Sequence, residues 1–451
     1  MNKIFTNTYC KTLASSLIGI LVLSSANAYA TVSQSPLSLT VGVPPNMLLT
    51  LDDSGSMRWA FAPDNKRDLS ATRRVKSNTF NPLYYNPSAN YRAPIVFDTS
   101  GNESQLSSTF NNARINGYNS ARGNLNLSND YKVSWTYVLE QGLVDEYGYD
   151  NTASKLAENP VSDFSGTVTR TSNGTSTVTT PGGITFSITR TGTSTCTAVA
   201  NLTGVFTNRA ASCSRPAANT YTATLSRAGV PAYYYAYDAT KLAGCTTDND
   251  NCYTLTFVPA AQQQNFANWY SFYRNRGLAT ISAAALAFYD LSPAVRLTWQ
   301  SLGNCTTFDG SQTNCRNNAL KEYSPAHKGQ LYAWLQNINF NQGTPLPAAL
   351  KRAGEFFQTE APWQKTPGGT GNTTQNTYAC RGSYHIMMTD GVWTTNVAAP
   401  SEFRDDASTF PLPDGLRTYT GRAPYLDSQS NTLADLAMHY WATDLRPGLA
   451  N

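Results

Sequence analysis

The sequence predicts an α/β protein whose mostly parallel sheet has helices on both faces and carries a large β-rich insertion. Residues 46–52 and 384–390 are continuous apolar runs that each end in an aspartate. Continuous rather than alternating apolar character is typical of a strand buried on both faces of a parallel sheet. Other apolar residues recur at steps of three and four, as in amphipathic helices. Strands that alternate with such helices indicate an α/β sheet.

The expected elements divide the chain after residue 30 into three parts. Residues 31–59 hold the first strand and a polar loop, residues 60–261 form the insertion, and residues 262–451 complete the sheet. A third strand is expected at residues 295–302, and an apolar stripe at helical spacing covers residues 264–289. Further helices are expected at residues 331–335, 346–357 and 433–441.

The insertion differs from the rest of the chain because it is rich in Ser, Thr, Asn, Gly and Tyr. Residues 161–224 carry many Thr-x-Thr repeats and turns such as 181–183, which predict short antiparallel strands. Residues 230–237 predict an aromatic strand. A flexible linker is the alternative interpretation of Ser/Thr richness. The aromatic residues and cysteines favour an ordered, β-rich insertion.

Residues 1–30 have the order of a secretory signal peptide. Lys3 and Lys11 flank a short basic start, and an apolar run follows at residues 13–23. Small residues come next, with cleavage expected after Ala28 or Ala30. The apolar run is too short to span a bilayer as a helix, and a buried N-terminal helix is the alternative. No later run is long and apolar enough for a transmembrane helix. We therefore expect export and no integral membrane segment after signal cleavage.

Seven cysteines remain after the signal, and an oxidising compartment favours disulfides. Sequence neighbours suggest three pairs that each close a short polar loop, but six cysteines allow fifteen connectivities. Cys380 is then odd, and is either free or paired with a partner beyond residue 451 or in another chain. The suggested pairs are Cys196–Cys213, Cys245–Cys252 and Cys305–Cys315.

Composition argues against several classes of function. Charged residues make up 14% of the chain, and 33 Lys and Arg balance 29 Asp and Glu, which is too even for a nucleic-acid-binding face. The three histidines, His327, His385 and His439, lie far apart in the sequence. They offer little for a histidine-rich zinc site or a Ser-His-Asp enzyme. We expect a protein that is not an enzyme and has no nucleic-acid partner.

Oxygen-bearing side chains stand where the buried-type strands end. Asp52, Ser54 and Ser56 alternate after the first strand, Thr344 precedes a helix, and Asp390 ends another strand. Loops at the carboxyl ends of strands converge in an open α/β sheet, and such oxygens suit Mg²⁺, Mn²⁺ or Ca²⁺. Each residue also has a simpler interpretation: a capped turn for the first three, a helix N-cap for Thr344, and a turn for Asp390.

This combination resembles the von Willebrand factor A domain with its metal-ion-dependent adhesion site. The resemblance implies a doubly wound, mostly parallel sheet. It implies that Ser54, Ser56 and Thr344 bind the metal directly, and that Asp52 and Asp390 complete the shell. The implied metal is a divalent cation, Mg²⁺ or Mn²⁺ before Ca²⁺. One coordination position would remain open for a carboxylate from a partner.

Further stretches resemble the N-terminal half of PilY/PilC-type type IV pilus tip proteins, with the insertion as the poorly matched part. They are residues 51–57, 81–87, 265–270, 343–346, 433–437 and 443–447. Members of that family continue into a β-propeller with its own calcium site, to which nothing here corresponds. An A-type domain would also add a strand and a helix after residues 433–441. We therefore expect a fragment or a truncated product.

The resemblance implies an adhesin or biogenesis factor that passes the inner membrane, enters the periplasm and reaches the pilus tip or cell surface. Implied partners are minor pilins, the pilus tip, and a host or abiotic surface ligand with an exposed carboxylate. One alternative is a structural protein for pilus assembly or tension at the tip, in which metal only stabilises the fold. A secreted hydrolase is a remote alternative, based on the Asp-Ser pair after the first strand.

Two weaker candidates lie in the insertion. The acidic stretch 248–251 could bind Ca²⁺, but it lacks the Gly and distal Glu of an EF-hand loop, which favours a solvated disulfide loop. The tyrosines Tyr233, Tyr234, Tyr235 and Tyr237 could form an aromatic binding surface, although buried strand packing is the favoured interpretation.

Overall fold

The structure is a computed structural model of the 451-residue chain. The chain divides into two compact units, Met1–Val43 and Pro44–Asn451, and every element below belongs to the second. The expected signal peptide at residues 1–30 lies outside the described residues. Among the described helices, none is both long and apolar enough to cross a bilayer. The described residues are 43–66, 73–129, 131, 164–225, 231–366, 377–393, 409–422, 426 and 432–449.

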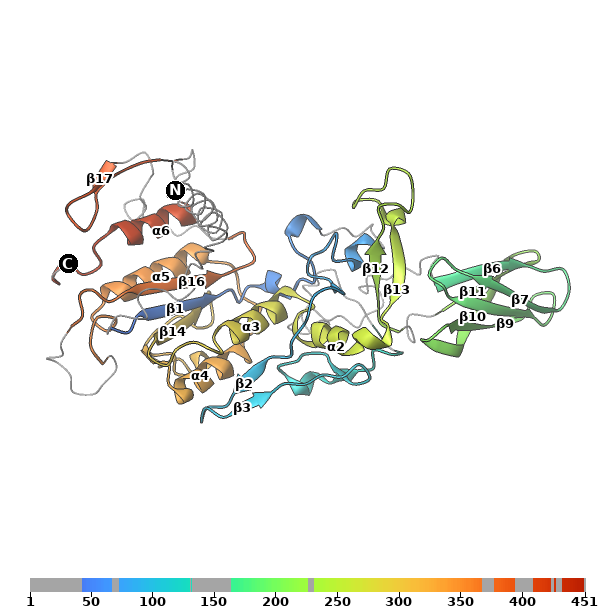
Figure 1. Cartoon of the computed structure of the whole chain (residues 1–451), viewed down its shortest axis with the longest axis horizontal. Coiled ribbons are helices and arrows are strands. Elements are labelled where there is room, and N and C mark those ends of the chain that lie inside the picture. The colour runs from blue at the N-terminus through green and yellow to red at the C-terminus, as the bar shows by residue number, and fades with distance from the viewer. Residues whose placement is uncertain are drawn as a thin grey trace, which may run out of the picture. The chain divides into compact units, whose positions relative to one another are not determined.

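A four-stranded sheet lies at the centre of the α/β part, in the order β15–β14–β1–β16 (Figure 1). β1 (Asn46–Leu51) pairs in parallel with β14 (Arg296–Ser301) on one side and with β16 (Ser383–Met388) on the other. The short β15 (Lys321–Glu322) joins the outer side of β14 in the antiparallel direction.

β1 and β16 lie where the two continuous apolar runs predicted strands, and β14 lies within the third expected strand at residues 295–302. The expected burial on both faces is wrong for β16, because Tyr384 and Ile386 are 44% and 37% exposed.

Helices pack on both faces of this sheet (Figure 1). Successive side chains of a strand point to opposite faces, and β1 shows this directly. Leu49 and Leu51 share a buried cluster with side chains of α3 and α4, whereas Leu48 packs with Ala353 and Phe357 of α5. The helices are α2 (Gln263–Phe272), α3 (Arg276–Ala287), α4 (Pro325–Leu335), α5 (Leu346–Gln358) and α6 (Leu433–Ala442).

The stripe predicted over residues 264–289 corresponds to two helices rather than one. α2 ends at Phe272, and Asn275 then caps α3 by accepting a hydrogen bond from the Leu278 amide at 2.9 Å. An asparagine at this position satisfies an amide that the first helical turn leaves without a partner. The helical spacing of apolar residues continues through the break, so the pattern did not reveal it.

A six-stranded antiparallel sheet occupies the stretch where short strands were expected, in the order β6–β11–β10–β9–β8–β7 (Figure 1). β8 alternates between partly buried and buried residues, and Phe186 and Ile188 lie on its inner face with no exposed surface. The strands are β6 (Ser165–Thr169), β7 (Gly174–Thr179), β8 (Thr185–Arg190), β9 (Cys196–Leu202), β10 (Phe206–Ala217) and β11 (Thr220–Thr224).

The rest of the insertion contributes short pairs of strands, and part of it packs into the α/β core. Val96, Phe97 and Tyr118 belong to the same buried cluster as Leu49 of β1. The pairs within the insertion are β2 (Ile95–Phe97) with β3 (Glu103–Gln105), β4 (Ala113–Arg114) with β5 (Asn124–Leu125), and β12 (Tyr233–Tyr237) with β13 (Tyr253–Phe257). Near α6, β17 (Thr409–Pro411) pairs with β18 (Thr418–Thr420).

Candidate functional site

The parallel strands place the ends of β1, β14 and β16 at one edge of the sheet. Leu51 pairs with Ser301 of β14 and with Met388 of β16, so the loops after all three strands begin side by side. The amide of Asp52 continues the pairing by donating to the Met388 carbonyl at 2.9 Å. This edge is where an open α/β sheet binds its ligands.

The loop after β1 turns its oxygen atoms toward one another. Oδ1 of Asp52 accepts a hydrogen bond from the Ser54 amide at 2.7 Å, and Oδ2 accepts one from the Thr389 hydroxyl at 2.7 Å. The hydroxyls of Ser54 and Ser56 lie 3.0 Å apart, at the start of a 3₁₀ turn over Gly55–Arg58. Two hydroxyls and one carboxylate therefore converge over a few residues.

Burial raises the pKa of Asp52, because the carboxylate has no exposed surface and loses hydration. The hydrogen bonds from Ser54 and Thr389 oppose this shift in pKa, and the negative charge of Asp390 adds to it. The effect of the Asp390 charge on the pKa of Asp52 indicates that the two carboxylates are close enough to interact electrostatically. A cation beside Asp52 would replace the hydration that burial removes.

Thr344 reaches the same edge through a loop that pairs with the loop after β1. Gln342 bridges to Ser54 in the parallel direction, its amide donates to the Asp53 carbonyl at 3.0 Å, and its carbonyl accepts from the Gly55 amide at 3.0 Å. Thr344 follows two residues later and is 5% exposed. The N-cap of α5 is Pro345, so Thr344 does not hold the capping position that the simpler interpretation gave it.

Asp390 is held by an arginine that the sequence analysis did not single out. Its Oδ2 accepts a hydrogen bond from Nη1 of Arg276 at 2.6 Å, and the two side chains are 8% and 6% exposed. Arg276 opens α3, 114 residues before Asp390 in the chain. The only hint in the sequence is a charged residue within a long apolar stripe, which does not identify its partner.

Asp53 is the second residue that the sequence analysis missed. Its carboxylate is buried and accepts three backbone hydrogen bonds from the loop after β14. The donors are the amides of Leu302, Gly303 and Asn304, at 3.0, 3.1 and 3.0 Å. Asp53 therefore fixes this loop to the β1 loop, while its neighbour Asp52 faces Ser54 and Thr389. The only sign of this role in the sequence is that a second aspartate directly follows Asp52.

The side chains at this edge fit a hard divalent cation by their chemistry. Mg²⁺ and Mn²⁺ prefer carboxylate, hydroxyl and water oxygens, and the Asp52, Ser54 and Ser56 oxygens already lie together. Within the described residues, no group of three or more His, Cys, Asp and Glu side chains could hold a metal ion. The expected set is of another kind, because three of its five residues are hydroxyl-bearing.

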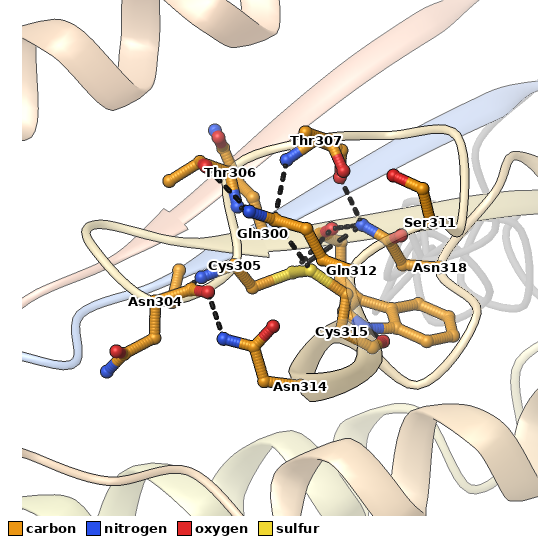
Figure 2. The surroundings of a disulfide bond; sticks show 12 residues. Gln300, Asn304, Cys305, Thr306, Thr307, Ser311, Gln312, Asn314, Cys315 and Asn318 are labelled. Carbon is orange, nitrogen blue, oxygen red and sulfur yellow. Dashed lines mark hydrogen bonds between the residues drawn. A yellow bond between two sulfur atoms is a disulfide. The ribbon is translucent and has the colours of Figure 1, made fainter.

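A disulfide lies beside the loop that Asp53 holds. Cys305 is bonded to Cys315, and its amide donates to the Ser301 hydroxyl at 2.9 Å. Amide side chains surround this disulfide, and among them Asn318 donates to the Thr307 carbonyl at 2.6 Å (Figure 2). The other two expected pairs, Cys196–Cys213 and Cys245–Cys252, also form, and Cys380 is a free, exposed thiol.

The two weaker candidates have structural roles. The Asp250 carboxylate accepts hydrogen bonds from the amides of Arg73 and Arg74 at 3.2 and 3.0 Å, and so ties the disulfide loop to a neighbouring turn. Tyr233 and Tyr235 have no exposed surface, and Tyr234 is 8% exposed. These three tyrosines are therefore core residues rather than an exposed binding surface.

Comparisons with known proteins show that this chain is similar in sequence to a group of pilus proteins. It is 36% identical over 449 residues to the type IV pilus biogenesis factor PilY1 of Pseudomonas aeruginosa strain PAK. It is 35% identical over 451 residues to PilY1 of strain PAO1, and 36% identical over 443 residues to PilY1 of strain UCBPP-PA14. These alignments cover 97%, 97% and 95% of the chain.

The similarity supports the PilY-type resemblance that the sequence motifs indicated. The chain spans about a third of the length of these relatives, 31% of the first two and 30% of the third. No family model matches the chain. No solved structure matches it either.

Proposed function

We propose that the chain is the exported, von Willebrand factor A-like part of a type IV pilus-associated protein, and that it binds a divalent cation at the described sheet edge. Ser54, Ser56 and Thr344 would be direct ligands, and Asp52 and Asp390 would complete the shell. Mg²⁺ or Mn²⁺ is preferred over Ca²⁺. The proposal is carried by the contacts of Ser54, whose amide and hydroxyl both bind the Asp52 carboxylate and whose hydroxyl lies 3.0 Å from the Ser56 hydroxyl.

The bound cation would present an open coordination position to an acidic group of a partner. The similarity to proteins named type IV pilus biogenesis factors supports an association with the pilus. A minor pilin at the tip, or a surface ligand with an exposed carboxylate, has the required chemistry. In this proposal the chain acts by binding rather than by catalysis, at the pilus tip or cell surface after export.

Thermal unfolding of the purified protein tests the cation site. A ligand that binds only the folded state stabilises it by about 2.7 kcal/mol at a concentration one hundred times its Kd. We expect Mg²⁺ or Mn²⁺ to raise the Tm above its value in chelator, and Thr344→Ala to abolish this rise. Thr344→Ser is the matched control, because it keeps the hydroxyl and should keep most of the rise.

A cooperative transition whose Tm does not change with any divalent cation would reject the cation site but not the fold. A rise that persists in Thr344→Ala would place the cation elsewhere. Asp52→Ala then separates binding from a purely structural role of the metal. If Asp52→Ala lowers stability while adhesion per folded molecule persists, the metal stabilises the fold and does not bind the partner.

A further inference from the structure

Arg276 is a fixed positive charge at the rim of the proposed cation site. Each of its three side-chain nitrogens donates a hydrogen bond: Nε to the Phe61 carbonyl at 2.8 Å, Nη1 to Asp390 at 2.6 Å, and Nη2 to Asp64 at 2.6 Å. The guanidinium also lies against the Trp59 and Phe61 rings, 4.7 and 5.4 Å from their centres. Such an arrangement holds the charge in one orientation.

The two carboxylates of the candidate site therefore differ in their partners. Asp52 accepts hydrogen bonds from neutral donors, the Ser54 amide and the Thr389 hydroxyl. Asp390 is bound to a full cation, and both members of this pair are nearly buried. Charge-assisted hydrogen bonds of this kind are about twice as strong as neutral ones. A cation that recruited Asp390 directly would have to compete with Arg276.

We propose that Arg276 determines the ligand specificity of the site by withholding Asp390 from direct coordination. With Asp52 as the one carboxylate beside it, a divalent cation keeps about one positive charge, whereas direct coordination by the Asp390 carboxylate would neutralise that charge. The retained charge, together with the field of Arg276, makes the open position favour an anionic partner group over water or a neutral amide. This inference rests on the proposed cation site and concerns a residue outside its expected ligand set.

The inference predicts opposite effects on two ligands in one variant. In Arg276→Gln, Asp390 is released, and we expect the purified protein to bind Mn²⁺ about tenfold more tightly, the size of one nearby charge. Acetate should bind the Mn²⁺-loaded variant about tenfold more weakly, because the second carboxylate lowers the charge of the cation. Titration followed by the electron paramagnetic resonance of Mn²⁺ measures both affinities.

Two further variants serve as controls. Arg276→Lys keeps the charge and should restore most of both wild-type affinities. Arg276→Gln combined with Asp390→Asn should lose the gain in Mn²⁺ affinity, because the released carboxylate is gone. If Arg276→Gln does not unfold cooperatively, Asp390→Asn alone is used. It should lower the Mn²⁺ affinity by up to about threefold, because Asp390 completes the shell without binding the cation directly.

A merely structural ion pair would give a different pattern. Arg276→Gln would then weaken Mn²⁺ and acetate binding together or change neither, and either result would overturn the inference. A tenfold loss of Mn²⁺ affinity in Asp390→Asn would show direct coordination in the wild type and would also overturn it. A wild-type protein that does not bind Mn²⁺ would instead reject the proposed cation site, and the inference would fail with it.

Discussion

β14 of the α/β sheet is buried at every residue, whereas β8 of the six-stranded sheet is fully buried only at every second one. The difference follows from what covers each sheet. Helices pack on both faces of β14, so its polar side chains lie inside the protein with its apolar ones. In β8 the inner face holds Phe186, Ile188 and the buried Arg190, and the Ser and Thr residues lie on the other face.

The two sheets consequently use their polar residues in different ways. In the α/β sheet, Nε2 of Gln300 donates to the Thr50 hydroxyl at 2.9 Å and to the Ala349 carbonyl at 2.8 Å, which ties two strands to α5. In the six-stranded sheet, the hydroxyls of Thr175 and Thr189 pair at 2.8 Å on the surface. Polar residues of the first sheet fix elements around the candidate site, while those of the second are near water.

The largest expected effect tests the inner face of the six-stranded sheet. Phe186→Ala should lower the free energy of unfolding by about 4 kcal/mol, because it removes a fully buried ring and leaves a cavity. Urea unfolding followed by circular dichroism measures the change. Thr175→Ala on the exposed face is the control, with an expected change within about 0.5 kcal/mol. Similar losses in the two variants would break the contrast between the faces of this sheet.

A buried polar residue should matter more at the candidate site than on the surface of the six-stranded sheet. Asp53→Ala removes the acceptor of three backbone amides, and we expect a loss of about 3 kcal/mol in the free energy of unfolding. Asp53→Asn keeps one acceptor oxygen and should lose less. Faster hydrogen exchange at Gly303 and Asn304 would locate the effect. A loss below about 0.5 kcal/mol in Asp53→Ala would show that the loop after β14 holds its position without this carboxylate.

The sequence predicted the positions of the three parallel strands of the α/β sheet. Burial on both faces holds for β1, but β16 is only partly buried, with Tyr384 and Ile386 44% and 37% exposed. The sequence also predicted that Asp52, Thr344 and Asp390 stand at strand or helix ends, and parallel pairing places these ends at one edge. The metal itself and the von Willebrand factor A likeness remain predictions. The six-stranded sheet was predicted as a class, but its strand order was not.

Arg276 and Asp53 could not be assigned from the sequence, because their roles depend on contacts between distant segments. The partners of Arg276 lie 212 and 114 residues away, and the amides that Asp53 binds begin 249 residues away. Periodicity also failed at the break before Asn275, where a capping hydrogen bond divides two helices without disturbing the apolar stripe. The spacing of apolar residues predicts which face of a helix or strand is buried. It does not predict which distant loops a polar side chain joins by hydrogen bonds.

The smallest expected effect is on the pH dependence of stability, because the two sheets differ in their content of titratable residues. Burial lowers the pKa of His385 on β16 from 6.5 to about 4, and its Nε2 lies 2.7 Å from the Thr50 hydroxyl. The six-stranded sheet and its loops, residues 164–225, contain no Asp, Glu, Lys or His. Between pH 7 and 4.5, histidine protonation should therefore weaken the α/β sheet and leave the six-stranded sheet unaffected.

The sign follows from which state binds the proton more tightly. The unfolded chain binds it at the ordinary pKa, whereas folded His385 resists it, so protonation favours unfolding. The contribution of His385 is complete above pH 6.5 and is lost as the pH falls toward 4, with a loss of about 2.5 kcal/mol at pH 4.5. Hydrogen exchange, corrected for its intrinsic pH dependence, should show β16 losing protection at pH 4.5 while β8 keeps it. His385→Gln should remove much of that loss, and equal losses in β8 and β16 would mean that the two sheets open together.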